Sequence, residues 1–264
     1  MVEDRFREIF DGVAETLPPS LSKLRALHPR LCLNLHGGTR SAWLTALSGA
    51  QYRAGFQHYR LRAAYNVLIP RAQQILKVDR KVHTAEHLAS AIFFLGAPSS
   101  EIPAAKLAAA VAPAILSPMR PPYAVIHPVA ATPAKTWPAA NFIAIANHLN
   151  AAGIQPIFVG SAQDDLTPFA AHRTIQGATL SEIKSLLSAA ALFIGNDSGP
   201  AHMAAAFHLP AIVLFGASDP AIWAPWKTKS EVLTHPEGIA AIPPAQVAAA
   251  IDRMLRSADH RSAN

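Results

Sequence analysis

The stretch ALFIGNDSGPAHMAAAFHLPAIVLFG, residues 191–216, decides the fold class, because it alternates short apolar runs with an alanine-rich segment. The pattern predicts a strand over 191–194, a helix over 199–208 and a second strand over 210–215. Connections of only a few residues join these elements, so the strands must be parallel and the helix must cross over between them. We therefore expect a doubly wound α/β sheet, whose ligand sits beyond the carboxyl ends of its strands.

The same alternation extends through the rest of the second half of the chain. The expected elements are strands over 123–127 and 154–159 and helices over 138–152, 163–172, 180–190 and 245–256. Polar loops that follow the strands are consequently the places where chemistry is expected.

The first half of the chain is less regular. Its expected elements are helices over 3–17, 21–27, 40–47 and 84–95 and a strand over 31–35, with 50–82 left unassigned. The proline-rich run SPMRPP, residues 117–122, predicts an interdomain linker. The expected organisation is an N-terminal domain over 1–116, this linker, and a C-terminal domain over 123–264 whose final helix could pack back on the first domain.

Composition excludes several classes of protein. The 264-residue chain is 51% hydrophobic and 15% charged, which excludes intrinsic disorder. Its single cysteine, Cys32, excludes a disulfide framework and a cysteine-based zinc site. The apolar runs are too short and too interrupted by proline to span a bilayer, and the charged N-terminus is unlike a signal peptide. The sequence therefore predicts a cytoplasmic protein.

The positive charge is concentrated in one segment. The net charge is +6, and residues 40–81 alone carry +7, since eight lysines and arginines there face only Asp79. Such a segment favours an anionic partner, which could be a nucleic acid, a phosphorylated ligand or an anionic lipid surface. The alternative is a solvated basic face. No nucleic-acid recognition motif accompanies the charge, so we expect no nucleic-acid partner.

The loop after residue 194 leads directly into a helix. Its backbone amides and the helix dipole suit a phosphate, and Ser198 could add a hydroxyl donor. Asp197 could bind sugar hydroxyls. Alternatively, Asp197 or Ser198 caps the helix. His202 lies in the first helical turn, where we expect a buried structural histidine.

Two other loops carry candidate ligands. Lys135 lies between a strand end and a helix start, where its charge could neutralise a diphosphate, with Thr132 as an additional donor. The alternative for Lys135 is an ordinary surface lysine. Asp164 or Asp165 could hold a ribose through its paired hydroxyls, or could cap a helix. No cluster of metal ligands stands out in the sequence, and no metal is expected.

Together these segments resemble glycosyltransferase family 9, the ADP-heptose:lipopolysaccharide heptosyltransferases. Residues 191–219 match the family's Gly-Asn-Asp-Ser-Gly-Pro-x-His run and the strand that follows it. Residues 126–149 match its His-Pro-Gly segment with the later Lys-x-Trp-Pro, although Val129 stands where the family often has glycine. Residues 33–56 match its Leu-His-Gly segment, and the similarity covers about residues 31–225.

The resemblance implies a GT-B-like fold of two Rossmann-like domains, with an ADP-sugar site in the C-terminal domain. It implies that Lys135 and Thr132 contact the diphosphate and that Asp197 binds the heptose hydroxyls. The implied donor-binding set is completed by Asp164 at the ribose and by Ser198, Gly199, Pro200, Ala201 and His202. The implied reaction is an inverting, metal-independent and cofactor-free transfer of heptose to the lipopolysaccharide inner core, an anionic glycolipid acceptor reached by peripheral contact with the inner membrane.

The chain departs from the family pattern at its N-terminal end. Family members usually open with a strand, a Gly-Asp loop and a helix that hold the aspartate taken as the general base, and no such loop precedes residue 31. We therefore expect a truncated N-terminal domain. His36, at the carboxyl end of a strand, is the expected substitute base. The alternative is a catalytically impaired remnant that binds nucleotide sugars.

Overall fold

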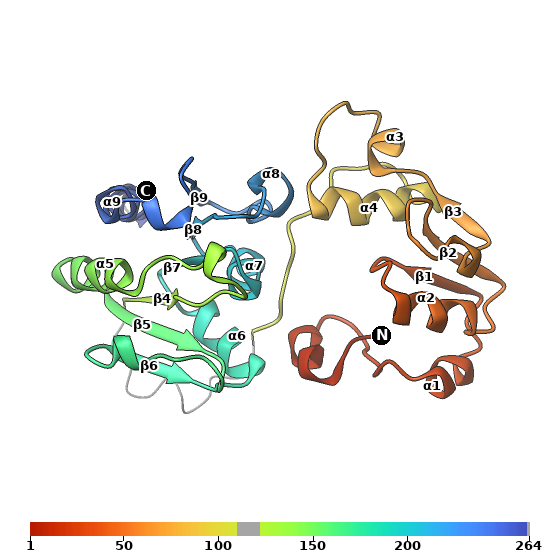
Figure 1. Cartoon of the computed structure of the whole chain (residues 1–264), viewed down its shortest axis with the longest axis horizontal. Coiled ribbons are helices and arrows are strands. Elements are labelled where there is room, and N and C mark those ends of the chain that lie inside the picture. The colour runs from red at the N-terminus through yellow and green to blue at the C-terminus, as the bar shows by residue number, and fades with distance from the viewer. Residues whose placement is uncertain (110–121, 263–264) are drawn as a thin grey trace. The chain divides into compact units, whose positions relative to one another are not determined.

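The computed structural model describes residues 1–109 and 122–262, and its side chains up to residue 256 (Figure 1). The expected linker, 117–122, lies outside the described residues except for Pro122, so the proposed domain boundaries stay predictions. No helix in the described part of the chain combines the length and the apolarity needed to cross a bilayer.

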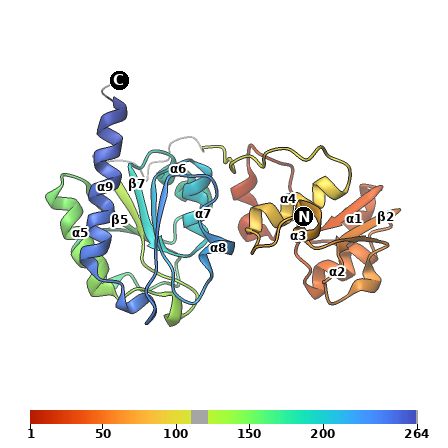
Figure 2. The ribbon, with the colours of Figure 1, turned by 90° about the horizontal axis from the view of Figure 1, so that it is seen from above.

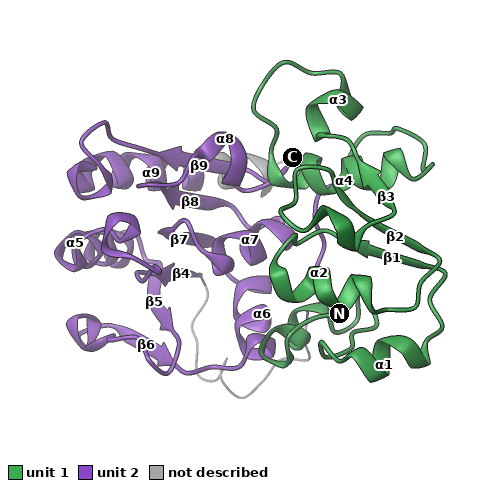
Figure 3. Cartoon of the chain, turned by 45° about the vertical axis from the view of Figure 1, so that its right-hand side comes forward, with its two compact units in different colours: residues 1–103 green, residues 104–264 purple. Residues whose placement is uncertain are grey.

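The chain forms two compact units, residues 1–103 and 104–264, which Figure 3 shows in different colours. The second unit is built on a six-stranded parallel sheet in the order β6-β5-β4-β7-β8-β9. Its strands are β4 (Tyr123–His127), β5 (Gln155–Gly160), β6 (Arg173–Gln176), β7 (Leu192–Asn196), β8 (Ala211–Leu214) and β9 (Ser230–Leu233). All neighbouring strands pair in parallel, which confirms the predicted doubly wound sheet.

Helices cover both faces of this sheet, as Figure 2 shows. They are α5 (Ala139–Ala151), α6 (Leu180–Ser188), α7 (Gly199–Ala206), α8 (Pro220–Trp223) and α9 (Pro244–Ser262), with 3-10 helices at Pro133–Lys135, Thr167–Phe169 and Ile239–Ala241. Successive strand residues point to opposite faces, so the buried strands supply two cores. Ile126 and Ile194 pack with α5 and α9, whereas Val125 and Phe193 pack with α6 and α7.

The order of the strands reverses between β4 and β7. From β4 the chain first moves outward through β5 and β6, and it then returns to β7 on the other side of β4. A Cβ at Gly195 would lie 2.8 Å from the carbonyl oxygen of His127, so only glycine allows this close approach of the two strands. Ligands of doubly wound sheets bind at such a switch point, beyond the carboxyl ends of the strands.

The first unit holds a three-stranded parallel sheet in the order β1-β2-β3. Its elements are α1 (Leu21–Ala26), β1 (Leu31–Asn34), α2 (Thr39–Ala46), β2 (Tyr52–Phe56), β3 (Val67–Ile69), α3 (Ala72–Leu76) and α4 (Thr84–Phe94), with 3-10 helices at Asp4–Phe10 and Arg62–Ala64. Ala42 of α2 packs on one face of the sheet with Tyr65, and Ala91 of α4 packs on the other with Phe56. The first unit is therefore also a parallel sheet with helices on both faces. The segment 50–82, which the sequence left unassigned, forms β2, β3, α3 and the 3-10 helix between the two strands.

The predicted helix over 3–17 is wrong. The chain instead forms the 3-10 helix Asp4–Phe10, none of whose residues is buried, and Gly12 follows with φ at 77°. Val13 is 51% exposed, so the apolar repeat has no core to pack against. Because most helical stability in proteins comes from such packing, periodicity alone does not hold an α-helix here.

The predicted helix over 163–172 is also wrong. Pro168 lies inside this segment, and it has no amide hydrogen for a helical bond. The segment forms only the short 3-10 helix Thr167–Phe169, and Asp165 Oδ1 accepts a hydrogen bond from the amide of Thr167 just before the chain turns toward β6. The sequence missed β6 because this edge strand buries one residue alone, Ile175.

Candidate functional site

Three loops that follow neighbouring strands bring a lysine, an aspartate and a serine together at the carboxyl edge of the second unit's sheet. Lys135 lies in the loop after β4, Asp197 after β7 and Ser218 after β8. The Nζ of Lys135 is 3.3 Å from Oδ2 of Asp197, and the Oγ of Ser218 donates to the same oxygen at 2.5 Å. The structure therefore joins the two predicted residues Lys135 and Asp197 in one cluster.

The Asp197 carboxylate is nearly buried, with 9% of its side chain exposed. Its Oδ1 lies 3.9 Å from Nε2 of His202, so the carboxylate has two side-chain donors, Lys135 and Ser218, and a histidine ring nearby. The alternative prediction that Asp197 caps α7 is therefore wrong. The expectation of a buried structural histidine is also wrong, because 42% of the His202 side chain is exposed and its ring faces Asp197.

Ser198 stands at the N-cap position of α7 but does not cap the helix with its side chain. Its Oγ lies 3.1 Å from Nδ1 of His127, the last residue of β4. Burial lowers the pKa of His127 to about 4, although the nearby Asp164 carboxylate opposes this shift. The imidazole is consequently neutral near pH 7, and its contact with Ser198 ties the end of β4 to the start of α7.

The first turn of α7 offers fewer backbone donors than the sequence suggests. Pro200 has no amide hydrogen. The amide of Ala201 already donates to the carbonyl oxygen of Ser198 at 3.1 Å. A Cβ placed on Gly199 would meet no atom within 4 Å, so this residue has open space in front of it. Of the residues 198–201 predicted to bind a phosphate, Ser198 and Gly199 therefore remain as the candidates for backbone donors, and the helix dipole adds positive potential there.

Asn196 fixes the loop that carries Lys135. This side chain is fully buried, its Nδ2 donates to the carbonyl oxygen of Pro128 at 2.9 Å, and its Oδ1 accepts from the amide of Trp137 at 3.1 Å. Asn196 thus holds the loop at both of its ends. Lys135 is 33% exposed and is held in an ion pair, unlike the surface lysine of the alternative prediction.

Thr132 and Asp164 also lie in loops at this edge of the sheet. Thr132 is exposed, and its carbonyl oxygen accepts a hydrogen bond from the hydroxyl of Thr136 at 2.9 Å. Asp164 Oδ2 accepts the amide of Ser161 at 2.6 Å, so it closes the loop after β5 and does not cap a helix. Their expected contacts with a diphosphate and a ribose stay predictions.

His36 belongs to the first unit and lies just beyond the carboxyl end of β1, where it is exposed. The buried Asn34 fixes this turn, since its Oδ1 accepts the amides of His36 and Gly37 at 3.0 and 3.1 Å. The Nδ1 of His36 itself accepts the amide of Gly38 at 3.3 Å. A lone pair on Nδ1 places the proton of the neutral ring on Nε2.

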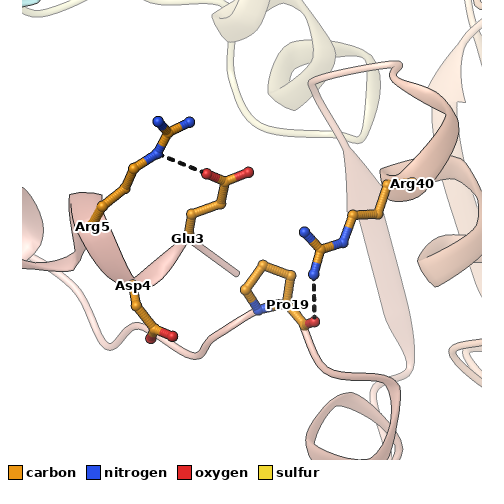
Figure 4. A pocket seen from close by; sticks show the side chains of 5 residues that line it. All are labelled: Glu3, Asp4, Arg5, Pro19 and Arg40. Carbon is orange, nitrogen blue, oxygen red and sulfur yellow. Dashed lines mark hydrogen bonds and ion pairs between the residues drawn. The ribbon is translucent and has the colours of Figure 1, made fainter.

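A pocket of about 290 Å³ in the first unit contains none of the predicted site residues. It is lined by Glu3, Asp4, Arg5, Pro19 and Arg40 (Figure 4). Both arginines already have acceptors of the chain's own, because Arg5 donates to Glu3 at 2.9 Å and Arg40 to the carbonyl oxygen of Pro19 at 3.4 Å. We therefore place the candidate site at the switch point. Within the described residues, no group of three or more His, Cys, Asp or Glu side chains could hold a metal ion.

Sequence reasoning missed three residues of this site. Ser218 follows β8, the neighbour of β7, and that place in the topology is the signal that could have found it. Asn196 and His127 are the last residues of strands that are otherwise apolar and buried. A polar residue at the carboxyl end of such a strand is a usable signal, because parallel strands in this fold end at the ligand.

Comparison with known proteins places these features in a family. A family model described as glycosyltransferase family 9 (heptosyltransferase) matches residues 21–241. Lipopolysaccharide heptosyltransferase 3 of Escherichia coli is 34% identical over 163 residues, which are 51% of this chain and 47% of the relative. Lipopolysaccharide heptosyltransferase 2 of E. coli K12 is 32% identical over 113 residues, 38% of this chain and 32% of the relative. The chain thus spans about half the length, or less, of these curated relatives.

Solved structures share the fold over almost the whole chain. A glycosyl transferase family 9 protein from Veillonella parvula has a TM-score of 0.81 at 18% identity, covering 97% of this chain and 87% of its own. The E. coli ADP-heptose lps heptosyltransferase II has a TM-score of 0.77 at 22% identity, and the match covers 97% of this chain and 88% of that protein's chain. These likenesses confirm the predicted fold class, an α/β chain of two Rossmann-like domains of the GT-B type.

Proposed function

The chain belongs to glycosyltransferase family 9, and on this premise we propose that it transfers heptose from ADP-heptose to the inner core of lipopolysaccharide. One observation carries the proposal: Lys135 and Asp197 meet at 3.3 Å at the switch point of the donor-side sheet. A cation beside an open helix N-terminus suits a diphosphate, and a fixed carboxylate suits sugar hydroxyls. The names of the matched relatives supply the sugar and the acceptor.

The departing ADP needs positive charge as its bond to the sugar breaks. In the proposed mechanism Lys135 and the first turn of α7 supply this charge, at an edge where both groups are held before the donor arrives. The acceptor hydroxyl attacks the anomeric carbon from the side opposite the ADP, so the configuration inverts. Because Lys135 and the first turn of α7 supply the positive charge in this mechanism, the transfer needs no metal ion, and we expect it to persist in EDTA.

The acceptor hydroxyl must also lose a proton to a base. His36 is the proposed base, and the structure restricts how it can act, because its basic nitrogen Nδ1 is bound to the amide of Gly38. His36 would have to release this contact before it could accept a proton, since moving the ring proton from Nε2 to Nδ1 would also end the bond from the amide of Gly38. A His36→Ala variant should therefore retain ADP binding and lose transfer, whereas transfer at the wild-type rate would contradict the assignment.

The expected acceptor is an anionic glycolipid at the inner membrane surface, which the basic segment 40–81 would face. Part of this charge is used within the unit, since Arg80 pairs with Glu86 at 2.6 Å and Arg53 donates to the carbonyl oxygen of Ala64 at 3.3 Å. Arg60, Arg62 and Lys77 are exposed and are the proposed acceptor contacts. Replacing these three by glutamine should raise KM for the acceptor and leave ADP binding unchanged.

The test of the proposed function is a transfer assay. The chain is incubated with ADP-heptose and a lipopolysaccharide acceptor that lacks inner-core heptose, and the acceptor mass is measured. We expect the acceptor mass to increase by one heptose with wild type and to stay unchanged with Lys135→Ala. Lys229→Ala is the control and should behave as wild type, because Lys229 lies at the amino end of β9, away from the carboxyl ends of the strands.

A second candidate function is a nucleotide-sugar-binding remnant without catalysis. The observation that favours it is the occupied Nδ1 of His36, the only base proposed within the chain. A wild-type chain that binds ADP but adds no heptose to any heptose-deficient acceptor would support this second function. A wild-type chain that binds no ADP would contradict both.

A further inference from the structure

We propose that Ser218 is a positioning residue, which holds the Asp197 carboxylate in place for the donor sugar while Lys135 turns toward the diphosphate. The inference rests on the proposed function and deepens it. It assigns a role to a residue that does not itself contact the donor.

The two residues reach each other because their strands are neighbours. Asp197 directly follows β7 and Ser218 lies four residues beyond β8, and these strands pair with Asn196 opposite Leu214. The amide of Asp197 also donates to the carbonyl oxygen of Leu214 at 3.1 Å, which fixes the backbone of Asp197 against β8. The Ser218 hydroxyl then donates to Oδ2 at 2.5 Å, a charge-assisted bond that fixes the side chain as well.

The two oxygens of the Asp197 carboxylate have different contacts. Oδ2 accepts hydrogen bonds from Ser218 and Lys135, whereas the contact that Oδ1 makes among the described side chains is with His202, at 3.9 Å, beyond the length of a hydrogen bond. Oδ1 therefore retains the acceptor capacity that a sugar hydroxyl would use. The orientation of the carboxylate decides where this oxygen points.

Lys135 alone could not maintain that orientation during binding. Its ammonium group has three hydrogen-bond donors and lies at the end of a flexible side chain. An arriving diphosphate attracts this group more strongly than a single carboxylate does. The same diphosphate repels the Asp197 carboxylate. The hydroxyl of Ser218 is neutral and is attached to a different loop, so its bond to Oδ2 persists when Lys135 moves.

The test compares the affinity for ADP with that for ADP-heptose by calorimetry, in wild type, Ser218→Ala, Ser218→Thr and Ser188→Ala. Ser188, at the end of α6, loses a similar hydroxyl bond, to the carbonyl oxygen of Ser185, away from the site. We expect Ser218→Ala to weaken ADP-heptose binding about tenfold relative to ADP, or about 1.4 kcal/mol. ADP binding itself should stay within about twofold of wild type. Ser218→Thr, which keeps the hydroxyl, and Ser188→Ala should show the wild-type ratio.

A merely structural serine would give a different result. If Ser218→Ala left the ratio of the two affinities unchanged, whether or not both affinities fell, the positioning role would be overturned. Failure of Ser218→Thr to restore the ratio would also overturn it. A wild-type chain that binds ADP but not ADP-heptose would instead contradict the proposed function, so the two failures are distinguishable.

Discussion

The ammonium of Lys135 lies 3.3 Å from Oδ2 of Asp197, although 62 positions separate the two residues in the chain. The contact exists because β4 and β7 are neighbours at the switch point and both end at the same edge of the sheet. The positive group proposed for the diphosphate and the negative group proposed for the sugar are thereby held side by side. Each neutralises the other until a ligand arrives, which makes the burial of Asp197 tolerable.

The charge balance of this pair can be tested with Asp197→Asn. Removing the carboxylate frees Lys135 from its partner, so calorimetry should show ADP bound at least as tightly as by wild type. ADP-heptose should lose about tenfold in affinity relative to ADP, because an amide replaces the charged group proposed to accept hydrogen bonds from the sugar hydroxyls. Asp252→Asn, which breaks the pair of Asp252 with His148 between α9 and α5, is the matched control. A fall in ADP affinity confined to Asp197→Asn would contradict this division of roles.

Asn196→Ala should destabilise the second unit. The substitution leaves the carbonyl oxygen of Pro128 and the amide of Trp137 without their buried partner, at a cost of about 2–4 kcal/mol. Urea unfolding of the variant should show this loss against Asn150→Ala, an exposed position on α5. ADP affinity should fall as well, since the loop that holds Lys135 is no longer fixed. Unchanged stability would show that Asn196 does not hold the loop.

His127 predicts a specific dependence of stability on pH. Its pKa is about 4 in the folded chain, because burial disfavours the charged imidazole, and 6.5 is the ordinary value. The unfolded chain therefore binds the extra proton between these values. The contribution of His127 is complete above pH 6.5 and is lost as the pH falls toward 4, by roughly 3 kcal/mol in total.

The measurement is the free energy of unfolding from pH 7 to pH 4 in wild type and in His127→Gln, which keeps a polar partner for Ser198. The variant should lose less stability over this range than wild type. His58 and His87 of the first unit also have pKa values lowered by burial, so the difference between the two proteins, not the slope of either, isolates His127. Parallel curves would contradict the assignment.

The sequence predicted the elements that are buried and locally consistent. The strands β4, β5, β7 and β8 are continuous apolar runs, and α5 ends where Gly153 takes a φ of 76°, so pattern and backbone preference agree. Edge strands such as β6 and β9 bury little and therefore gave no signal. The helix over 3–17 failed for the converse reason, because an apolar repeat was present and a core to receive it was not.

Some residues of the candidate site were predictable from the sequence, but the contacts between them were not. Lys135 and Asp197 could be proposed from the loops that carry them. The bond between Ser218 and Asp197 could not, since it depends on β8 lying beside β7. The neutral state of His127 depends on burial in the same way. Ser198 shows the limit most clearly, because its local sequence favours a helix cap and its hydroxyl instead contacts a histidine 71 positions away.

The most direct test of the proposed nucleotide-sugar site is a calorimetric titration of ADP into the chain and into Lys135→Ala. We expect one ADP site per chain, with an affinity that Lys135→Ala lowers by tenfold or more, because the variant loses the cation proposed for the diphosphate and leaves the Asp197 carboxylate beside it without its ion-pair partner. The control Lys229→Ala, whose Nζ donates to the carbonyl oxygen of Met254, should bind as wild type does. ADP binding that is absent from wild type, or that survives Lys135→Ala undiminished, would contradict the assignment of the switch point as the nucleotide-sugar site.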